Sequence, residues 1–256
     1  MRNLLRKSRR ELSKAVRKLA APEGVRELPP EWPDDFSDFT RALCRRVAPY
    51  TMTSKERVQA VEAAVRHIVQ HDLAGDIVEC GVAGGGSMMA AALTLLELGR
   101  SDRTIWLYDT FAGMTEPTPE DVGRFGQPAL ERYRAKLKDG VSTWINIPLA
   151  QVQANFAGVA YPRERLRFVP GKVEDTLPRE QPQRIALLRL DTDWYTSTKV
   201  EMQQLYPRLC PGGLIIIDDY FRWQGSRKAV DDYVAQHRVA IFWSRIDDHA
   251  VIGVKP

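Results

Sequence analysis

The sequence predicts an α/β fold whose centre is a doubly wound, mostly parallel sheet of seven strands. Three observations support this prediction: short apolar strands alternate with helices, a glycine-rich turn follows the first strand, and acidic residues stand directly after three of the strands. The chain has 256 residues, of which 44% are hydrophobic, so one large domain is a better prediction than two small ones.

Residues 1–33 are predicted to be a basic N-terminal arm followed by a proline-rich linker, and residues 34–256 to be the domain. Residues 1–20 carry a net charge of +7 within a total of +4, which leaves −3 for the rest of the chain. We therefore expect no nucleic-acid binding by the domain. The apolar spacing of the arm predicts a helix that is solvated, packs on a partner or contacts an anionic membrane surface.

The composition also predicts where the protein works. Three cysteines without close spacing argue against a disulfide framework and a zinc site, and they fit a reducing compartment. No run of about 18 apolar residues is present, so no transmembrane helix is expected. The basic start lacks the uninterrupted apolar core of a secretory signal. Together these features predict a cytoplasmic protein.

The elements of the domain follow from the pattern of apolar residues and helix breakers. A helix over residues 54–72 is expected to begin at Ser54, whose hydroxyl suits an N-cap. Residues 111–148, rich in glycine and proline with one helical piece near 128–138, are interpreted as a lid that contacts the acceptor. Further helices are expected at residues 87–98, 197–208 and 226–236. Strands are expected at residues 75–81, 104–108, 166–169, 185–190, 214–217, 239–243 and 250–254.

The glycine-rich turn after the first strand reads E-C-G-V-A-G-G-G-S at residues 79–87. Glycines there let a ligand approach the backbone, and the N-terminus of the next helix offers free N–H groups. Asp109 ends the second strand, where its carboxylate can accept hydrogen bonds from ribose hydroxyls. The turn is not G-x-G-x-x-G, so it favours a nucleoside without a pyrophosphate, such as S-adenosylmethionine (SAM). The alternatives are tight helix–sheet packing for the glycines and a helix cap for Asp109.

Acidic residues follow two apolar strands that a doubly wound sheet places side by side. Asp191 and Asp193 follow the first of these strands, and Asp218 and Asp219 follow the second. We expect Asp191, Asp218 and Asp219 to converge at one edge, where three carboxylates cannot all stay ionised without compensation. All-oxygen ligation suits Mg²⁺. The alternative is a set of solvated loop acids, with helix caps at Asp193 or Asp218.

Four segments carry a family resemblance: residues 79–87 (E-C-G-V-A-G-G-G-S), 108–114 (Y-D-T-F-A-G-M), 190–195 (L-D-T-D-W-Y) and 212–220 (G-G-L-I-I-I-D-D-Y). They resemble the macrocin O-methyltransferase family, whose members have the Rossmann-like fold of class I SAM methyltransferases and methylate sugar or phenolic hydroxyls of natural products. Y-T-M-T-S at 50–54 and G-K-V-E-D-T-L-P at 171–178 are similar in kind.

The resemblance implies a SAM-dependent O-methyltransferase of antibiotic biosynthesis. Its acceptor would be a sugar hydroxyl of a glycosylated natural product, a nucleotide sugar or a polysaccharide, and the protein would form a homo-oligomer. By the same resemblance Asp193 is the general base, and Mg²⁺ is held by Asp191, Asp218 and Asp219. The SAM site would be lined by Tyr50, Met52, Thr53, Glu79, Gly81, Ser87, Asp109 and Asp175.

Three other functions are weighed against this one. A catechol-type O-methyltransferase acting on an aromatic diol would share the fold and the metal and would use Lys172 or Lys199 as the base. A nicotinamide oxidoreductase would need a G-x-G-x-x-G turn and a Tyr-x-x-x-Lys pair, which the sequence lacks. A non-catalytic, membrane-associated binding protein would use the basic arm.

Two groups of side chains near the predicted site have more than one interpretation. Trp194 and Trp223 are candidates for stacking on an acceptor ring. The basic residues of the predicted lid either meet an anionic group, such as a nucleotide diphosphate, or form a solvated helix face. These residues are Arg124, Arg132, Arg134 and Lys136.

Overall fold

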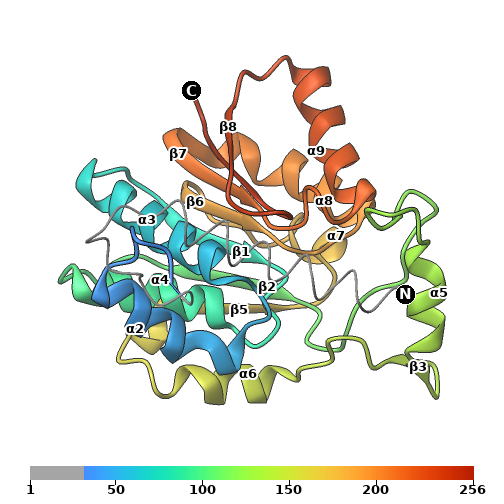
Figure 1. Cartoon of the computed structure of the whole chain (residues 1–256), viewed down its shortest axis with the longest axis horizontal. Helices are drawn as coiled ribbons and strands as arrows, with labels where there is room; N and C mark the ends of the chain where they lie inside the picture. Colours follow the sequence, from blue (N-terminus) through green and yellow to red (C-terminus); the bar gives the residue numbers. More distant parts are fainter. Residues whose placement is uncertain (1–31) are drawn as a thin grey trace, which may run out of the picture. The chain divides into compact units, whose positions relative to one another are not determined.

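Seven strands form one sheet in the order β5-β2-β1-β6-β7-β9-β8 (Figure 1). The structure is a computed structural model and describes residues 32–256. β5, β2, β1, β6 and β7 pair in parallel, and β9 pairs antiparallel with β7 and β8. The predicted doubly wound, mostly parallel sheet is therefore confirmed. Its strands are β1 (Asp76–Cys80), β2 (Ile105–Asp109), β5 (Leu166–Pro170), β6 (Ile185–Leu190), β7 (Leu209–Ile217), β8 (Phe242–Arg245) and β9 (Val251–Val254).

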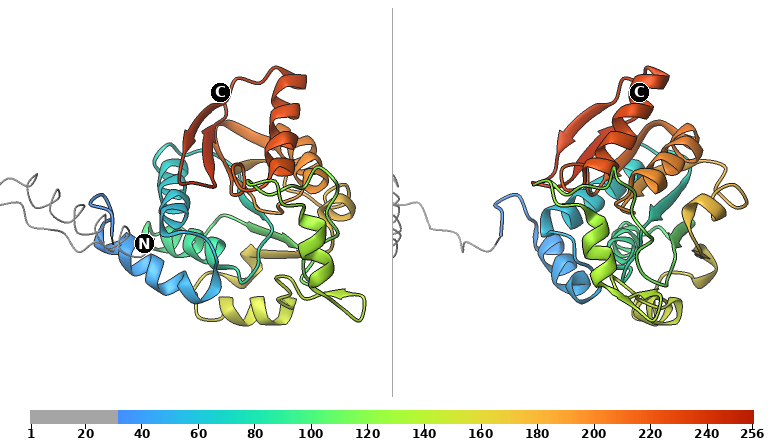
Figure 2. Two further views of the ribbon diagram at one scale, coloured as in Figure 1. Left: turned by 45° about the vertical axis from the view of Figure 1, so that its right-hand side comes forward. Right: turned by 90° about the vertical axis from the view of Figure 1, so that its right-hand side faces the viewer.

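Two groups of helices cover the two faces of the sheet, which the right-hand view of Figure 2 shows edge-on between the blue and the orange helices. The first group packs together as α2 (Asp38–Val47), α3 (Lys55–Gln70) and α4 (Gly86–Glu97). The second group is α7 (Val173–Thr176), α8 (Tyr195–Gln204) and α9 (Gln224–His237). Outside these two groups lie α6 (Leu149–Phe156) and the short helices η1 (Ala48–Tyr50), η2 (Arg163–Arg165) and η3 (Tyr206–Arg208), and α5 (Ala129–Ala135) belongs to the segment 111–148. Residues Asp38–Pro256 form one compact unit.

Most element boundaries agree with the sequence pattern. α3 begins at its predicted cap, because the Ser54 hydroxyl accepts a hydrogen bond from the Arg57 N–H at 3.2 Å. β7 differs from the prediction, since the strand expected at residues 214–217 begins already at Leu209 and its pairing with β6 includes a register shift. α2 and α6 were not predicted; α6 follows Pro148 and has no side-chain cap, whereas Ser37 and Asp38 at the start of α2 were an available signal. The helix predicted in the basic arm lies outside the described residues.

The register of the sheet brings three loops to one edge. Cys80 pairs with Leu190, and Leu190 pairs with Ile217, so β1, β6 and β7 end side by side. The residues that follow, Gly81 and Asp191, therefore sit next to each other, with Asp218 beyond. Ligands of doubly wound sheets bind at this carboxyl edge. No helix within residues 32–256 is both long and apolar enough to span a bilayer.

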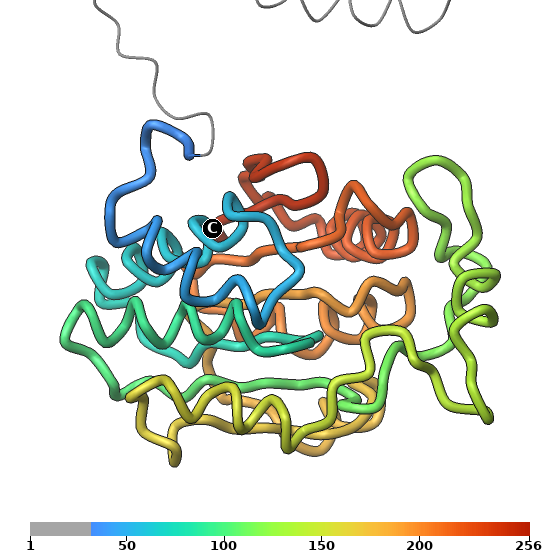
Figure 3. The backbone as a smooth tube through the Cα atoms, turned by 60° about the horizontal axis from the view of Figure 1, so that its bottom comes forward, coloured from blue at the N-terminus to red at the C-terminus, as the bar shows by residue number. Residues whose placement is uncertain are grey.

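The segment 111–148 stands at the end of the sheet where β2 stops, shown in light green in Figures 1 and 3. It contains α5 (Ala129–Ala135) and a hairpin of β3 (Leu137–Lys138) and β4 (Val141–Ser142). Backbone hydrogen bonds join it to the loop after β7, from the Arg124 N–H to the Arg222 carbonyl and from the Gln224 N–H to the Val122 carbonyl, both 2.8 Å long. We call this segment the lid.

Candidate active site

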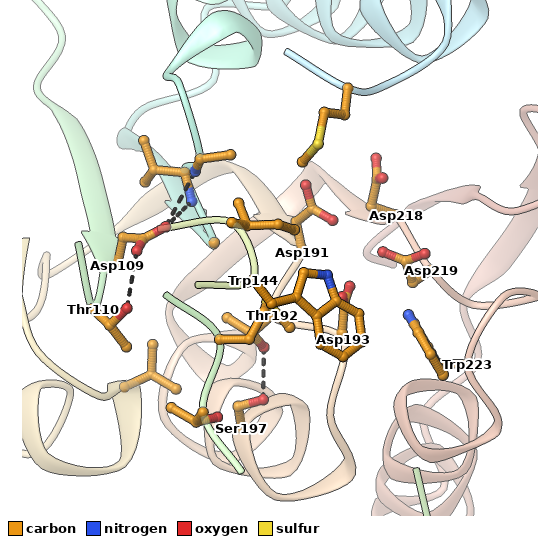
Figure 4. A pocket seen from close by; sticks show the side chains of 18 of the residues that line it. Asp109, Thr110, Trp144, Asp191, Thr192, Asp193, Ser197, Asp218, Asp219 and Trp223 are labelled. Atoms are coloured by element: carbon orange, nitrogen blue, oxygen red, sulfur yellow. Dashed lines mark hydrogen bonds between the residues drawn. The ribbon is translucent and has the colours of Figure 1, made fainter. Parts of the chain in front are cut away.

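A cavity of about 400 Å³ opens at the carboxyl ends of β1, β2, β6 and β7, with lid residues in its wall. Figure 4 shows carboxylates from three of these strand ends and the indole rings of Trp144 and Trp223 around one space. The glycine turn after β1 and the segment 51–53 form one side of the cavity. The loops after β6 and β7, together with the lid, form the other side.

Glycine in the turn after β1 permits direct contact between backbones. Gly81 has a φ of +84°, and a Cβ atom there would collide with the Asp191 carbonyl. A Cβ atom at Gly84 would lie 2.5 Å from the carbonyl oxygen of Tyr50. The turn therefore packs tightly against the loop after β6 and against the end of η1. The same turn therefore packs tightly against its neighbours and also presents its backbone to the cavity, where a ligand can approach it.

Asp109 shapes the same turn. Its Oδ2 atom accepts hydrogen bonds from the N–H groups of Val82 at 2.7 Å and Ala83 at 3.1 Å, and its Oδ1 atom accepts one from the Phe111 N–H at 2.7 Å. The Thr110 hydroxyl adds a longer contact to Oδ1 at 3.4 Å, so the roughly four acceptor positions of the carboxylate are occupied, and a ligand hydroxyl would replace this longest contact. Asp109 lines the cavity.

The residues predicted for the SAM site fall into two groups. Glu79 is 1% exposed within the sheet, Tyr50 packs against the glycine turn, and Asp175 is exposed on α7. None of these three lines the cavity, whereas Lys172 and Glu174, neighbours of Asp175, do. The five predicted residues that line it are Met52, Thr53, Gly81, Ser87 and Asp109.

An ion network inside the sheet was missed by the sequence analysis. Arg189 on β6 stands opposite Glu79 on β1 and is 1% exposed. Its guanidinium binds Glu79 at 2.6 Å, Asp191 at 2.7 Å and also Asp218. Burial raises the pKa of Glu79 to about 7, although the charge of Arg189 acts in the opposite direction. The available signal was a single arginine in the otherwise apolar strand I-A-L-L-R-L, since a buried arginine requires acidic partners.

Asp218 is held by cations on both carboxylate oxygens. Arg189 binds one oxygen and Arg57 binds the other, and the Thr53 hydroxyl lies 3.4 Å from the first. Arg57 also pairs with Asp247 at 2.9 Å. Asp218 thus faces arginines, and its predicted role as a metal ligand stays a prediction. In the sequence Arg57 is a neighbour of the helix cap Ser54, and no pattern there links it to Asp218.

Asp191, Asp193 and Asp219 come together instead, with one oxygen of each within 4.8 Å of the others (Figure 4). Burial raises the pKa of Asp191 and of Asp219 well above the usual range, and their neighbouring carboxylates add to this effect. Oxygens bound to one Mg²⁺ lie about 2.1 Å from the ion and hence up to about 4.2 Å apart. The oxygen donors are those that a hard divalent cation prefers, and such an ion would compensate the three charges; around Mg²⁺ they would have to lie slightly closer together than the 4.8 Å limit seen here.

Asp193 has an unusual backbone. Its φ is +71°, in the left-handed region that costs a non-glycine residue about 1 kcal/mol. Burial, followed by the charges of Asp191 and Asp218, raises the pKa of Asp193 to about 7, while a hydrogen bond with Asp219 lowers it. Strained residues of this kind cluster at functional sites.

The part of the cavity next to the lid is lined by aromatic rings. The ring of Trp144 lies 5.6 Å from Trp194 and 6.2 Å from Trp223 between centroids, and the Arg132 guanidinium lies 4.2 Å above Trp144. Trp144 and Trp223 line the cavity, but Trp194 is 2% exposed and does not. Stacking on an acceptor is therefore open to Trp223 and Trp144, whereas Trp194 supports them from behind. The role of Trp144 had no signal in the sequence.

Asp121 ties the lid to the loop that carries Asp193. It is 1% exposed, and its Oδ1 atom accepts a hydrogen bond from the Tyr195 N–H, the first residue of α8, at 2.7 Å. Its Oδ2 atom accepts hydrogen bonds from the N–H and the hydroxyl of Thr118 at 2.7 and 2.9 Å. A Cβ atom at Gly225 in α9 would collide with the same carboxylate. No pattern in the sequence indicates that Asp121 would bind the Tyr195 N–H.

Comparison with known proteins decides the family. The family described as Macrocin-O-methyltransferase (TylF) matches residues 13–254, nearly the whole chain. The chain belongs to the macrocin O-methyltransferase family. The resemblance seen in the four sequence segments is thereby confirmed, and with it a SAM-dependent O-methyltransferase on the class I methyltransferase fold.

Named relatives in this macrocin O-methyltransferase family extend the comparison. The chain is 36% identical over 202 residues to 8-demethyl-8-(2,3-dimethoxy-alpha-L-rhamnosyl)-tetracenomycin-C 4'-O-methyltransferase of Streptomyces olivaceus, covering 79% of this chain and 74% of the relative. It is 33% identical to Mycinamicin III 3''-O-methyltransferase of Micromonospora griseorubida, with 79% and 77% covered. The solved structure of the O-methyltransferase NovP aligns with a TM-score of 0.71 at 28% identity, covering 80% of this chain and 82% of that one.

Proposed function

We propose that this enzyme transfers the methyl group of SAM to a sugar hydroxyl in a Mg²⁺-dependent reaction of antibiotic biosynthesis. One observation carries the proposal: Asp191, Asp193 and Asp219 meet where the cofactor side of the cavity joins the tryptophan-lined acceptor side. The relatives named for methylating a rhamnosyl tetracenomycin and mycinamicin III support a sugar-bearing acceptor.

The residues present can serve each part of the reaction. The acceptor oxygen forms a bond to the methyl carbon as the sulfonium–carbon bond breaks, so sulfur leaves as a neutral thioether and the acceptor releases one proton. Asp193 receives that proton, because its carboxylate lies at the strand end beside Asp191 and Asp219, where the acceptor hydroxyl would be held. The indole rings of Trp144 and Trp223 exclude water and orient the sugar.

Asp191 and Asp219 would hold Mg²⁺, with Asp193 facing the same ion. When bound, the ion would lower the pKa of the acceptor hydroxyl and fix its position. Arg189 and Arg57 hold the Asp218 carboxylate beside this group, and Arg189 also fixes Asp191. An aromatic diol would be the alternative acceptor, because adjacent phenolic oxygens suit the same metal.

A methyl-transfer screen with labelled SAM tests the proposal. Glycosylated polyketides and nucleotide sugars are offered with Mg²⁺ and with EDTA, and catechols serve as the competing class. We expect labelled product from a sugar acceptor only when Mg²⁺ is present. Undiminished turnover in EDTA contradicts the metal assignment, and turnover of catechols alone contradicts the sugar assignment.

The Asp191→Ala variant separates the metal from the cofactor. Calorimetry should find SAM binding within about threefold of wild type, because Asp191 contacts the metal group and the glycine turn supplies the SAM contacts. Turnover should fall to background. The control is Asp175→Ala, since Asp175 is exposed and lies outside the cavity. Loss of SAM binding in Asp191→Ala alone would contradict this division of roles.

A further inference from the structure

We propose that the acceptor carries a phosphate or diphosphate group beside the sugar that is methylated, and that a basic groove next to the active site binds this group. The inference rests on the proposed function and names the chemical class of the acceptor. It depends on three observations: the groove is continuous with the acceptor end of the cavity, its acids are already neutralised, and its remaining arginines are held in place by aromatic rings.

The groove lies between the lid and the start of α9 and has a volume of about 640 Å³. Trp223 lines both the groove and the catalytic cavity, so the two spaces meet at this ring. Arg124 comes from the lid and Arg245 from β8, and both line the groove. A sugar seated over the Asp193 side of Trp223 would direct its substituent past this ring into the groove.

The two acids of the groove are occupied by neighbouring side chains. Asp231 accepts hydrogen bonds from the Tyr220 hydroxyl at 2.6 Å and from Arg227 at 3.3 Å. Asp232 accepts them from Lys228 at 2.6 Å and from the Tyr195 hydroxyl at 3.0 Å. These contacts cancel the charges of Arg227 and Lys228, so they add little to the attraction of an anion.

Within the part of the chain that the structure describes, Arg124 and Arg245, which line the groove, lack a firm carboxylate partner, as does Arg222, which lines the adjoining catalytic cavity. Among residues 32–256, neither Arg124 nor Arg222 forms a salt bridge, and Arg124 reaches only the carbonyl of Asp248, at 3.5 Å. Arg245 has one carboxylate near it, again on Asp248, at 3.8 Å and 82% exposed to solvent. An exposed pair at that distance is weak and exchanges readily for a better anion. The groove therefore has an excess of positive charge.

Aromatic rings hold these guanidinium groups in place. Arg245 lies 4.1 Å above Phe221, Arg222 lies 5.8 Å from Trp223, and Arg124 lies 5.6 Å from the adjacent Phe125. A guanidinium stacked on a ring keeps the N–H groups at its edge free, and this fork of donors matches phosphate oxygens. The order already imposed by the rings reduces the entropy lost when an anion binds.

The positive field reaches the catalytic cavity. His249 lines that cavity, and burial, followed by the charges of Arg222, Arg57 and Arg124, lowers its pKa. Only the charge of Asp247 acts the other way. A neutral glycoside has no group that would profit from this field. A phosphate ester on the sugar would, and both a nucleoside diphosphate and a lipid diphosphate carry one.

Four acceptors that share one sugar test the inference: the methyl glycoside, the 1-phosphate, the thymidine diphosphate ester and the farnesyl diphosphate ester. We expect kcat/KM for the phosphorylated acceptors to exceed that of the methyl glycoside at least about tenfold, and to fall as salt rises. The nucleoside and lipid esters identify which carrier is used. Equal kcat/KM for the methyl glycoside and every phosphorylated acceptor overturns the inference.

Variants locate the preference in the groove. Arg124→Gln combined with Arg245→Gln should raise KM for a phosphorylated acceptor about tenfold or more and so reduce its advantage over the methyl glycoside. Arg134→Gln is the matched control, because it removes the same charge from an exposed site on the lid outside both cavities. An equal loss in Arg134→Gln, or no loss in the double variant, contradicts the role of the groove.

Binding of pyrophosphate separates this inference from the proposed function. Calorimetry in the presence of SAM should detect pyrophosphate binding by wild type and at least about tenfold weaker binding by the double variant. If no acceptor is methylated but this difference is found, the proposed function fails and the anion site stands. If sugars are methylated but pyrophosphate does not bind, the sugar reaction stands and the phosphate assignment is wrong.

Discussion

The two sides of the cavity are built by different physical means. On the cofactor side, the glycine turn, Asp109 and the end of η1 meet through backbone groups, and a single added Cβ atom at Gly84 would disrupt the fit. On the acceptor side, ionised side chains and tryptophans surround the space, and the lid is fastened through Asp121. Arg189 belongs to both sides, because it pairs with Glu79 on β1 and with carboxylates after β6 and β7.

This difference separates what substitutions should do. A backbone-lined site binds the part of the substrate that never varies, and its residues change affinity or stability when they are altered. In the proposed reaction the acidic side chains would take part in the proton transfer and in the choice of acceptor, so their replacement should change the rate. Each prediction below tests one part of this contrast, beginning with the largest expected effect.

Asp193→Asn tests the acceptor side most directly. The variant cannot accept a proton from the acceptor, so kcat should fall about 10²- to 10⁴-fold, with SAM binding close to wild type. Single-turnover kinetics with labelled SAM and calorimetry measure the two quantities. Weakened SAM binding of similar size would show that the two sides are not separable.

Arg189→Met tests the residue that joins the two sides. It leaves Glu79 buried without its partner and Asp218 with Arg57 alone, and breaking such a network costs about 3–5 kcal/mol in the free energy of unfolding. Urea denaturation measures this. Arg100→Met breaks an exposed pair with Asp102 and should change stability little. Adding Glu79→Gln to Arg189→Met should recover part of the loss, and a failure to do so would argue that packing, not charge, is the cause.

Glu201→Gln tests a buried acid behind the acceptor loop. Glu201 is 0% exposed, its Oε1 atom accepts a hydrogen bond from the Thr192 hydroxyl at 2.8 Å, and burial raises its pKa to about 8 from 4.5. The folded protein therefore holds a proton that the unfolded chain releases between those pH values, so this contribution to stability is present at low pH and declines as pH rises from about 4.5 to about 8.

Glutamine keeps the acceptor for Thr192 but has no proton to lose. The unfolding free energy of Glu201→Gln should therefore fall less than that of wild type between pH 5 and pH 8.5, by about 3 kcal/mol. Chemical denaturation at both pH values measures the difference. Parallel pH profiles for the two proteins would mean that Glu201 is ionised in the folded state.

Asp121→Ala tests whether the lid belongs with the acceptor side. Removing the carboxylate leaves the N–H groups of Tyr195 and Thr118 unpaired, at a cost of about 1–3 kcal/mol. We expect kcat/KM for the acceptor to fall roughly ten- to hundredfold while the SAM dissociation constant stays the same. A change in the SAM constant alone would place the lid with the cofactor side.

Gly84→Ala tests the cofactor side and should have the smallest effect. The new Cβ atom meets the Tyr50 carbonyl, so the end of η1 must shift, at about 1–2 kcal/mol. The SAM dissociation constant should rise about tenfold, with kcat at saturating SAM near wild type. Gly158→Ala is the control, since its Cβ atom meets only the flexible end of Arg46 at 3.4 Å.

The spacing of residue types along the chain and a few short motifs are sufficient to predict the sheet and the family. Alternation of strands and helices set the seven-stranded topology, and acids placed directly after strands identified the edge where Asp109, Asp191 and Asp219 lie. Such local features can be predicted from the sequence because they depend on spacing along the chain. Four short segments are sufficient to predict the family, which the match over residues 13–254 confirms.

Which carboxylates meet, and which are instead bound by arginines, depends on contacts that form only when the chain is folded. The sequence places Asp218 with Asp191 and Asp219 in the predicted metal site, but Arg57 and Arg189, distant in the chain from Asp218, occupy both of its oxygens, while Asp193 lies beside Asp191 and Asp219. The lid contact of Asp121 has the same origin. Charges act through space over distances that the spacing of residues does not encode, so the partners of a buried ion become known only once the chain has folded.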